Sequence, residues 1–161
     1  MGKLIKLFFT ICVSFFTLIV AAQEAPAPNT PKIHIIFMGG NDCLNCVQWR
    51  RFDLTKLEKI PAFNRHKFTN VVKVSRSPVP ASFFLPSEIR QYKDMLDSAS
   101  NGIAGSPQMA IIVNDEVFDY LYGSYSADEI ELRINAIEAG GQYPYKRCLK
   151  VTQLRDCEIS R

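Results

Sequence analysis

The sequence predicts an α/β fold with the element order β-α-β-α-β-β-α. Short apolar runs rich in β-branched residues, bounded by glycine, proline or asparagine, predict strands. They alternate with longer segments whose apolar residues repeat at helical spacing. Two strand-like runs near the carboxyl end are separated only by turn-forming residues, which is typical of a hairpin, and a capped helical segment follows them.

The first strand is predicted at residues 33–38, a mostly apolar run that suits a strand buried on both faces and ends at Gly39-Gly40. A helix follows, beginning near Cys43, with Asp42 as its N-terminal cap. It is expected to continue to about residue 59, ahead of a proline. Its apolar positions include Trp49, the sole tryptophan, which is expected to pack in the core.

The second strand is predicted at residues 68–75 and the second helix at residues 87–98. The segment between them, residues 76–86, holds three prolines and is therefore expected to be a loop. Residues 109–113 and 117–122 are expected to form a hairpin around Asn114-Asp115-Glu116. The last helix is predicted at residues 127–139, with Ser126 as its cap and Glu129 three residues later.

The composition fits one ordinary globular domain. The chain has 161 residues, of which 47% are hydrophobic and 22% charged, with 19 basic against 16 acidic residues. A disordered protein would have fewer apolar residues and a larger net charge. The formal net charge of +3 is spread along the chain and is too weak for a nucleic-acid-binding surface. Both classes are excluded, and no nucleic-acid partner is expected.

Residues 1–22 have the three parts of a secretory signal peptide. Lys3 and Lys6 precede an apolar run at residues 7–20, and the small residues Val20 and Ala22 precede the expected cleavage point. The apolar run is shorter than the roughly 20 residues that a membrane span needs. We expect cleavage after about Ala22 and a bacterial periplasmic location. An uncleaved amino-terminal anchor and a eukaryotic secretory lumen are the alternatives.

The mature chain is expected to have three parts: a flexible leader at residues 23–31, a domain at residues 32–141 and a tail at residues 142–161. It keeps an even number of cysteines, as exported proteins with disulfides do, because Cys12 leaves with the signal. They are Cys43, Cys46, Cys148 and Cys157.

The pair Cys43-Leu44-Asn45-Cys46 is the candidate reactive centre. Cys43 is expected at a helix start, where free amide groups and the helix dipole favour the thiolate that attacks disulfides. A second thiol two residues further on can close a ring and release a mixed disulfide. A structural disulfide and a zinc site are the alternatives. Zinc would require two further ligands at suitable spacing, and we expect no metal or cofactor. His34 is expected to be a core residue and His66 to lie in a loop.

The first strand, the C-x-x-C sequence at a helix start, and Gly105-Ser106-Pro107 before a hairpin and final helix together resemble the thioredoxin-like family. More closely, they are similar to its small exported thiol-disulfide oxidoreductases. The resemblance covers about residues 32–139 and implies a central mixed sheet flanked by helices. It also implies that Cys43 is the attacking cysteine and Cys46 the resolving one.

The same resemblance implies that the Ser106–Pro107 bond is cis and lies beside the cysteine pair. In the family, the backbone of this loop pairs with an extended substrate segment. Ser106 would therefore contact the substrate, and Pro107 would keep the geometry of the loop. An ordinary trans proline at a strand edge is the alternative.

Departures from the family pattern favour a reductase. Asp42 replaces the aromatic residue that often precedes the first cysteine, and its charge opposes a nearby thiolate. Leu44-Asn45 lacks the histidine of strongly oxidising relatives, and the first strand lacks the buried carboxylate of thioredoxins. The expected partners are exported protein thiols or disulfides and a membrane electron donor or acceptor. The alternative is a non-catalytic binding module with a permanent Cys43–Cys46 disulfide, which presents the 76–86 loop to a partner.

Cys148 and Cys157 are expected to form a structural disulfide that fastens the tail. A straight helix would separate residues at this spacing by about 13 Å, beyond disulfide reach, so the tail would have to double back. A second redox pair that relays electrons to Cys46 is one alternative, and free thiols or contacts between chains are the others.

Overall fold

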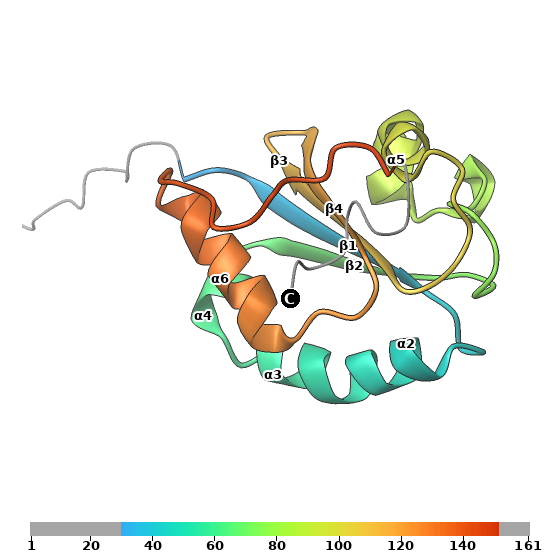
Figure 1. Cartoon of the computed structure of the whole chain (residues 1–161), viewed down its shortest axis with the longest axis horizontal. Helices are drawn as coiled ribbons and strands as arrows, with labels where there is room; N and C mark the ends of the chain where they lie inside the picture. The colour runs from blue at the N-terminus through green and yellow to red at the C-terminus, as the bar shows by residue number, and fades with distance from the viewer. Residues whose placement is uncertain (1–29, 152–161) are drawn as a thin grey trace, which may run out of the picture. The chain divides into compact units, whose positions relative to one another are not determined.

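A computed structural model describes residues 30–151 (Figure 1). The compact unit begins at Pro31. Within the described residues, no helix is both long and apolar enough to cross a lipid bilayer. The predicted signal peptide, almost all of the predicted leader, and Cys157 lie outside this range.

A four-stranded mixed sheet forms the centre of the domain. Its strands are β1 (Ile33–Gly39), β2 (Lys67–Val72), β3 (Gln108–Val113) and β4 (Glu116–Tyr122). They lie in the order β2-β1-β3-β4. Strand β1 runs parallel to β2 and antiparallel to β3, and β4 is antiparallel to β3. The predicted α/β class and element order are therefore confirmed.

The helices lie on both faces of the sheet. Side chains alternate between the two faces along each strand, so a strand with apolar residues throughout has two apolar faces that helices must cover. One face packs Ile35, Phe37 and Ile111 against the helices that follow β1 and the final helix. The other packs Ile36 and Ile112 against the helical segments between β2 and β3. Two apolar layers thus enclose the sheet, which explains why β1 is buried along its whole length.

The predicted first helix is continuous but not uniform. It comprises α2 (Leu44–Trp49), a π-helical segment (Arg50–Leu54) and α3 (Thr55–Leu57). A further short helix, α4 (Pro61–Asn64), begins at a proline that the prediction placed beyond the helix. Proline is well suited to the first turn, where its missing N–H would have no intrahelical partner.

The segments before β3 differ in detail from the prediction. Strand β2 ends at Val72, three residues earlier than predicted. The 76–86 loop contains one 3₁₀ turn (Ser82–Phe84). The predicted second helix begins as 3₁₀ (Ser87–Tyr92) and continues as α5 (Lys93–Ser100), which ends at Asn101 in the left-handed conformation.

The hairpin and final helix follow the sequence closely. Asn114 and Asp115 both have positive φ, as a two-residue hairpin turn requires, and Glu116 is already the first residue of β4. Helix α6 (Ala127–Glu138) has Ser126 as its cap. The Ser126 side chain accepts from the Glu129 N–H, and the Glu129 carboxylate accepts from the Ser126 N–H, so the predicted capping box is present.

The described part of the tail, residues 142–151, packs on the domain. The Tyr120 N–H donates to the Cys148 carbonyl at 2.8 Å, and the Val151 N–H donates to the Ala99 carbonyl at 2.8 Å. Cys148 and Val151 are both buried in the core layer beside α5. Hydrogen bonds therefore attach this part of the tail to β4 and α5. The predicted Cys148–Cys157 pairing stays a prediction because Cys157 lies outside the described residues.

Candidate active site

The two cysteines of the C-x-x-C sequence lie at the first turn of α2, directly after β1. They form a disulfide, with their Cα atoms 5.2 Å apart. Cys46 is fully buried in the core, whereas Cys43 is half-buried. Of the two residues, Cys43 is therefore the one within reach of a partner molecule.

Cys43 is also the N-terminal cap of α2. Its Sγ accepts a hydrogen bond from the Cys46 N–H at 3.1 Å, and its carbonyl accepts from the Val47 N–H at 3.0 Å. Amide donors and the positive end of the helix dipole stabilise negative charge at this position. In the reduced protein, the same arrangement favours the Cys43 thiolate.

The prediction that Asp42 caps the helix is wrong. Its carboxylate accepts hydrogen bonds from the Ser75 hydroxyl at 2.8 Å and from the Ser75 N–H at 3.1 Å. These bonds, that of the hydroxyl above all, hold the pKa of Asp42 below its ordinary value. Asp42 is consequently ionised at neutral pH and lies one residue before Cys43.

The loop between β1 and α2 is fixed from the π-helical segment. Arg50 donates hydrogen bonds to the Gly40 carbonyl at 3.2 Å and to Oδ1 of Asn41 at 2.8 Å. A Cβ atom on Gly39 would lie only 3.0 Å from the Cys46 Sγ, so glycine permits the close approach of β1 to the disulfide. The sequence did not indicate a role for Arg50, because basic residues on the outer face of a helix are more often solvated than hydrogen-bonded to backbone carbonyls.

The predicted substrate-binding residues lie in a loop before β3, residues 104–107, which we call the cis-proline loop. The Ser106–Pro107 peptide bond is cis. The Tyr122 hydroxyl donates to the Ala104 carbonyl at 2.8 Å, and the Gly123 N–H donates to the Pro107 carbonyl at 3.0 Å. Among the described residues, the buried Ser106 Oγ has no hydrogen-bond partner.

The sheet register brings the cis-proline loop to the same end of the sheet as the cysteines. Met38, near the end of β1, pairs with Gln108 at the start of β3. The cis-proline loop ends one residue before Gln108, and α2 begins shortly after β1 ends. Cys43, Cys46, Ser106 and Pro107 therefore belong to elements that meet at one end of the sheet.

Lys73 joins these elements and was not singled out from the sequence. It is 7% exposed, and its Nζ donates to the Gly105 carbonyl at 2.7 Å and to the Ser77 carbonyl. Its own N–H donates to the Gly39 carbonyl at 3.3 Å. Burial lowers the pKa of Lys73 to about 8, and the nearby Asp42 carboxylate acts in the opposite direction.

Beneath the disulfide, the core is apolar and aromatic. The rings of Phe37 and Trp49 are stacked, with centroids 4.2 Å apart, and the indole N–H of Trp49 donates to the Tyr125 carbonyl at 2.7 Å. Trp49 is thus a core residue, as expected. Phe37 lies on the face of β1 that packs toward Cys46, so that face of the strand offers no carboxylate to take a proton from the Cys46 thiol in the reduced protein.

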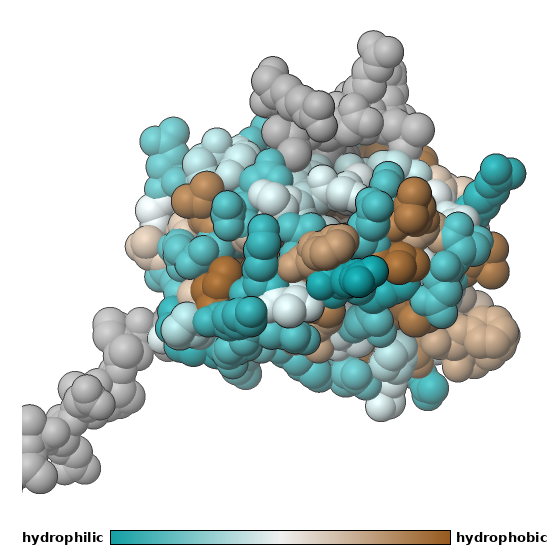
Figure 2. All heavy atoms as spheres, turned by 90° about the horizontal axis from the view of Figure 1, so that it is seen from below, coloured by the Kyte–Doolittle hydropathy of each residue, from teal (hydrophilic) through white to brown (hydrophobic). Residues whose placement is uncertain are grey.

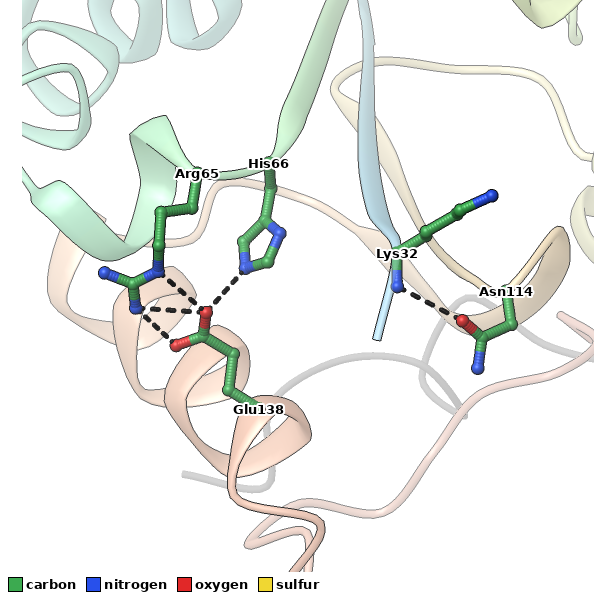
Figure 3. Close-up of polar contacts among 5 residues, drawn as sticks. All are labelled: Lys32, Arg65, His66, Asn114 and Glu138. Atoms are coloured by element: carbon green, nitrogen blue, oxygen red, sulfur yellow. Dashed lines mark hydrogen bonds and ion pairs between the residues drawn. The ribbon is translucent and has the colours of Figure 1, made fainter. Parts of the chain in front are cut away.

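Neither histidine lies in a cluster suited to a metal. His34 is buried, and its Nε2 is 2.8 Å from the Thr69 hydroxyl. Figure 3 shows His66 and Arg65 directed at the carboxylate of Glu138 on α6, with His66 Nε2 3.0 Å from Oε1. Across residues 30–151, no group of three or more His, Cys, Asp or Glu side chains could hold a metal ion.

The position of the disulfide after β1, the order of the mixed sheet, and the packing of helices on both of its faces together define the architecture. The fold is thioredoxin-like.

Comparison with solved structures finds the reduced form of the periplasmic thioredoxin SoxS from Paracoccus pantotrophus, with 10% sequence identity and a TM-score of 0.45. The match covers 67% of this chain and 97% of that one. It also finds the reduced C-terminal domain of DsbD from Neisseria meningitidis, with 17% identity, a TM-score of 0.38, and coverage of 70% and 83%. No family model and no curated protein matches the sequence.

Proposed function

We propose that this protein is an exported thiol-disulfide oxidoreductase that acts on the thiols or disulfides of other exported proteins. The observation that carries the proposal is the disulfide at the first turn of α2, with half-buried Cys43 outside and fully buried Cys46 inside. Cys43 is the nucleophile, Cys46 the resolving cysteine, and Ser106 and Pro107 bind the substrate backbone.

In the reducing direction, the Cys43 thiolate attacks one sulfur of a substrate disulfide. The substrate S–S bond breaks, and the attacked sulfur forms a mixed disulfide with Cys43. The other substrate sulfur leaves as a thiolate. The Cys46 thiolate then attacks the Cys43 sulfur and displaces the second substrate thiolate. The enzyme dithiol ends as the Cys43–Cys46 disulfide and the substrate disulfide ends as a dithiol, with two electrons transferred and the protons passed to the substrate thiolates.

We assign the reducing direction from the charges around Cys43. The ionised Asp42 opposes a thiolate one residue away and so disfavours the reduced form. A pair whose reduced form is less stable has a lower reduction potential and donates electrons more readily. A reductase outside the cytoplasm also requires a membrane electron donor, because the surroundings keep thiols oxidised.

The surface around the cysteines suits a protein substrate. Leu44, Val47 and Phe52 are exposed on the outer side of α2 and of the π-helical segment. Figure 2 shows the face seen from below in Figure 1, where apolar residues in brown stand among polar residues in teal. Apolar side chains beside the accessible cysteine supply contact area for an extended segment of a partner.

The reduction potential of the Cys43–Cys46 pair tests the proposal. The mature protein is equilibrated with thiol buffers of graded potential, alkylated, and the modified cysteines located by mass. A reversible value near or below about −270 mV supports a reductase, and a value near about −120 mV indicates an oxidant. A pair that titrates only in the unfolded protein excludes both.

Trapping experiments assign the two cysteines. Cys46→Ser is expected to accumulate mixed disulfides through Cys43, because the resolving step is missing. Cys43→Ser is expected to abolish exchange. Full exchange activity in Cys43→Ser contradicts the proposal.

A non-catalytic binding module is the second candidate, and one observation favours it. Phe83 and Phe84, in the 76–86 loop, are 70% and 71% exposed, with ring centroids 4.0 Å apart. Such a pair of exposed aromatic rings is suited to a protein contact. Resistance of the folded Cys43–Cys46 disulfide to dithiol reductants, together with loss of partner binding in Phe83→Ser, distinguishes this function from the first.

A further inference from the structure

Lys73 lies between the two loops that approach the disulfide. It follows β2 and is buried, and its N–H donates to the Gly39 carbonyl at the end of β1 at 3.3 Å. Two residues later, Ser75 binds Asp42, the residue before Cys43. Residues 73–77, which we call the bridging segment, thus contact the cysteine side of the site.

The bridging segment also contacts the cis-proline loop. The Ser77 carbonyl accepts from the Gly105 N–H at 3.3 Å, and Lys73 Nζ donates to the carbonyls of both Ser77 and Gly105. The amine therefore closes a small hydrogen-bonded ring around Gly105, next to Ser106. The only other side chain of the described residues that donates to the Gly105 carbonyl is Gln108, at 2.9 Å.

A buried ammonium group is costly, and the cost is offset where carbonyl or carboxylate oxygens accept its hydrogen bonds. Both acceptors of Lys73 are main-chain carbonyls of loops, with one in the cis-proline loop itself. An amine in this position constrains the backbone of Gly105, and through it the orientation of the Ser106 peptide groups.

We propose that Lys73 is a positioning residue for disulfide exchange, which fixes the cis-proline loop through the Gly105 carbonyl so that Ser106 can pair with the backbone of a peptide substrate. The proposal rests on the proposed function, since it assigns the means by which that site orders its substrate. Lys73 acts on substrate binding and not on the sulfur chemistry, because its ammonium group donates to loop carbonyls and not to either cysteine.

The test compares Lys73→Met, which keeps most of the side-chain length and removes the donors, with wild type and with Lys67→Met. Lys67 is exposed at the start of β2, the strand that Lys73 follows, and serves as the matched control. Amide hydrogen exchange at Gly105 is measured by NMR in the oxidised mature protein. Rates are measured with a disulfide-bonded peptide and with 2-hydroxyethyl disulfide, which is too small to pair with the loop.

Lys73→Met is expected to speed exchange at Gly105 about tenfold and to raise KM for the peptide about tenfold, the effect of losing the hydrogen bond to the Gly105 carbonyl. The rate with the small disulfide is expected to stay within about twofold of wild type. The equilibrium constant between the Cys43–Cys46 pair and the thiol buffer, which sets the reduction potential, is also expected to stay within about twofold. Lys67→Met is expected to change none of these values. Lys73→Arg, which keeps donors, is expected to restore part of the peptide affinity.

Unchanged exchange at Gly105 in Lys73→Met, or an equal loss of rate with both disulfides, would overturn the proposal. If the wild type exchanges no disulfide at all, the proposed function fails, and Lys73 then has no substrate to position even if Gly105 exchange responds. Should Lys73→Met not fold, wild type is compared with Lys73→Gln, which keeps a shorter neutral donor and is expected to shift Gly105 exchange and peptide KM in the same direction by a smaller factor. No change in either value would overturn the proposal.

Discussion

The carboxylate of Asp42 accepts hydrogen bonds from both the N–H and the hydroxyl of Ser75, a residue 33 positions away, instead of capping the helix that begins beside it. This contact attaches the bridging segment to the residue before Cys43 and keeps a negative charge near the accessible sulfur. The cap position is left to the Cys43 Sγ. The charge next to the nucleophile is therefore set by tertiary structure.

Asp42→Asn is expected to lower the pKa of the Cys43 thiol relative to wild type, because it removes a negative charge beside the thiolate. The reduced form is then more stable, so the reduction potential is expected to rise. The ultraviolet absorbance of the thiolate against pH measures the first change, and thiol-buffer equilibration measures the second.

Asp128→Asn is the control for this substitution, because Asp128 is exposed at the start of α6 and the change in net charge is the same. It is expected to leave both values unchanged. A shift of the same size in the two variants would show that net charge, and not the position of Asp42, affects Cys43.

Gly105→Ala is expected to displace the cis-proline loop. Gly105 has a φ of +126°, and a Cβ atom there would collide with the Tyr122 hydroxyl. We expect a loss of about 1–3 kcal/mol in unfolding free energy, measured by urea denaturation, together with weaker peptide binding.

Gly102→Ala separates backbone strain from collision. Gly102 also has positive φ, but its added Cβ would meet no atom within 4 Å. The expected loss is about 1 kcal/mol, with peptide binding unchanged. Equal losses in the two variants would contradict a specific role for the contact with Tyr122.

The sequence predicted the elements because their signals are local. The β-branched runs, the capping box at Ser126 and the turn residues Asn114 and Asp115 depend on neighbours in the chain, and all were observed. The cap at Asp42 was wrong, because a local rule takes no account of donors from a distant residue such as Ser75. The capping preference was outweighed by two hydrogen bonds from elsewhere in the fold.

Lys73 carried a signal that could have been used. In β2, Thr69 and Val71 are buried and alternate with exposed residues, so the next inward position along the chain is residue 73. A lysine at an inward position must find carbonyl or carboxylate partners. The strand period predicts that Lys73 is buried, but the identity of its partners depends on how the cis-proline loop packs.

Acidification is expected to destabilise the protein through His34. Burial, with the charge of Lys67, lowers the pKa of His34 from 6.5 to about 4. Between these values the unfolded chain binds a proton at His34 and the folded chain does not, so stability falls as the pH drops through this window. We expect a contribution on the order of 1–3 kcal/mol.

Urea denaturation at several pH values measures this effect in wild type and in His34→Gln. The variant is expected to be less stable at neutral pH, because the contact with Thr69 is altered, but to depend less on pH between about 6.5 and 4. The carboxylates titrate in both proteins, so the difference between the two slopes isolates His34. Parallel profiles would contradict the prediction.

The predicted Cys148–Cys157 disulfide is expected to fasten the tail without a part in exchange. Cys148→Ser with Cys157→Ser is therefore expected to loosen the tail, seen as faster amide exchange at Val151, whose N–H binds the Ala99 carbonyl. Disulfide exchange with peptide substrates is expected to be unchanged. Loss of activity with an unchanged fold would instead support a second redox pair.

The described part of the tail is also attached through a buried charge pair. Arg133 on α6 donates to Asp119 on β4 at 2.7 Å, and these residues are 3% and 0% exposed. The same carboxylate accepts from the Tyr143 hydroxyl at 2.7 Å and from the Cys148 N–H at 2.8 Å. Asp119 therefore joins α6, β4 and the tail.

Asp119→Asn is expected to lower the unfolding free energy by about 3–5 kcal/mol, because it leaves the Arg133 charge buried without a counter-ion. Asp119→Leu combined with Arg133→Met, which removes both charges, is expected to lose less. Arg65→Gln, which breaks the more exposed pair with Glu138, is the control and is expected to have a smaller effect, since solvent screens that pair. Urea denaturation ranks the three proteins. A double variant less stable than Asp119→Asn would show that the hydrogen bonds which Asp119 accepts from Tyr143 and Cys148 contribute more to stability than the charge pair does.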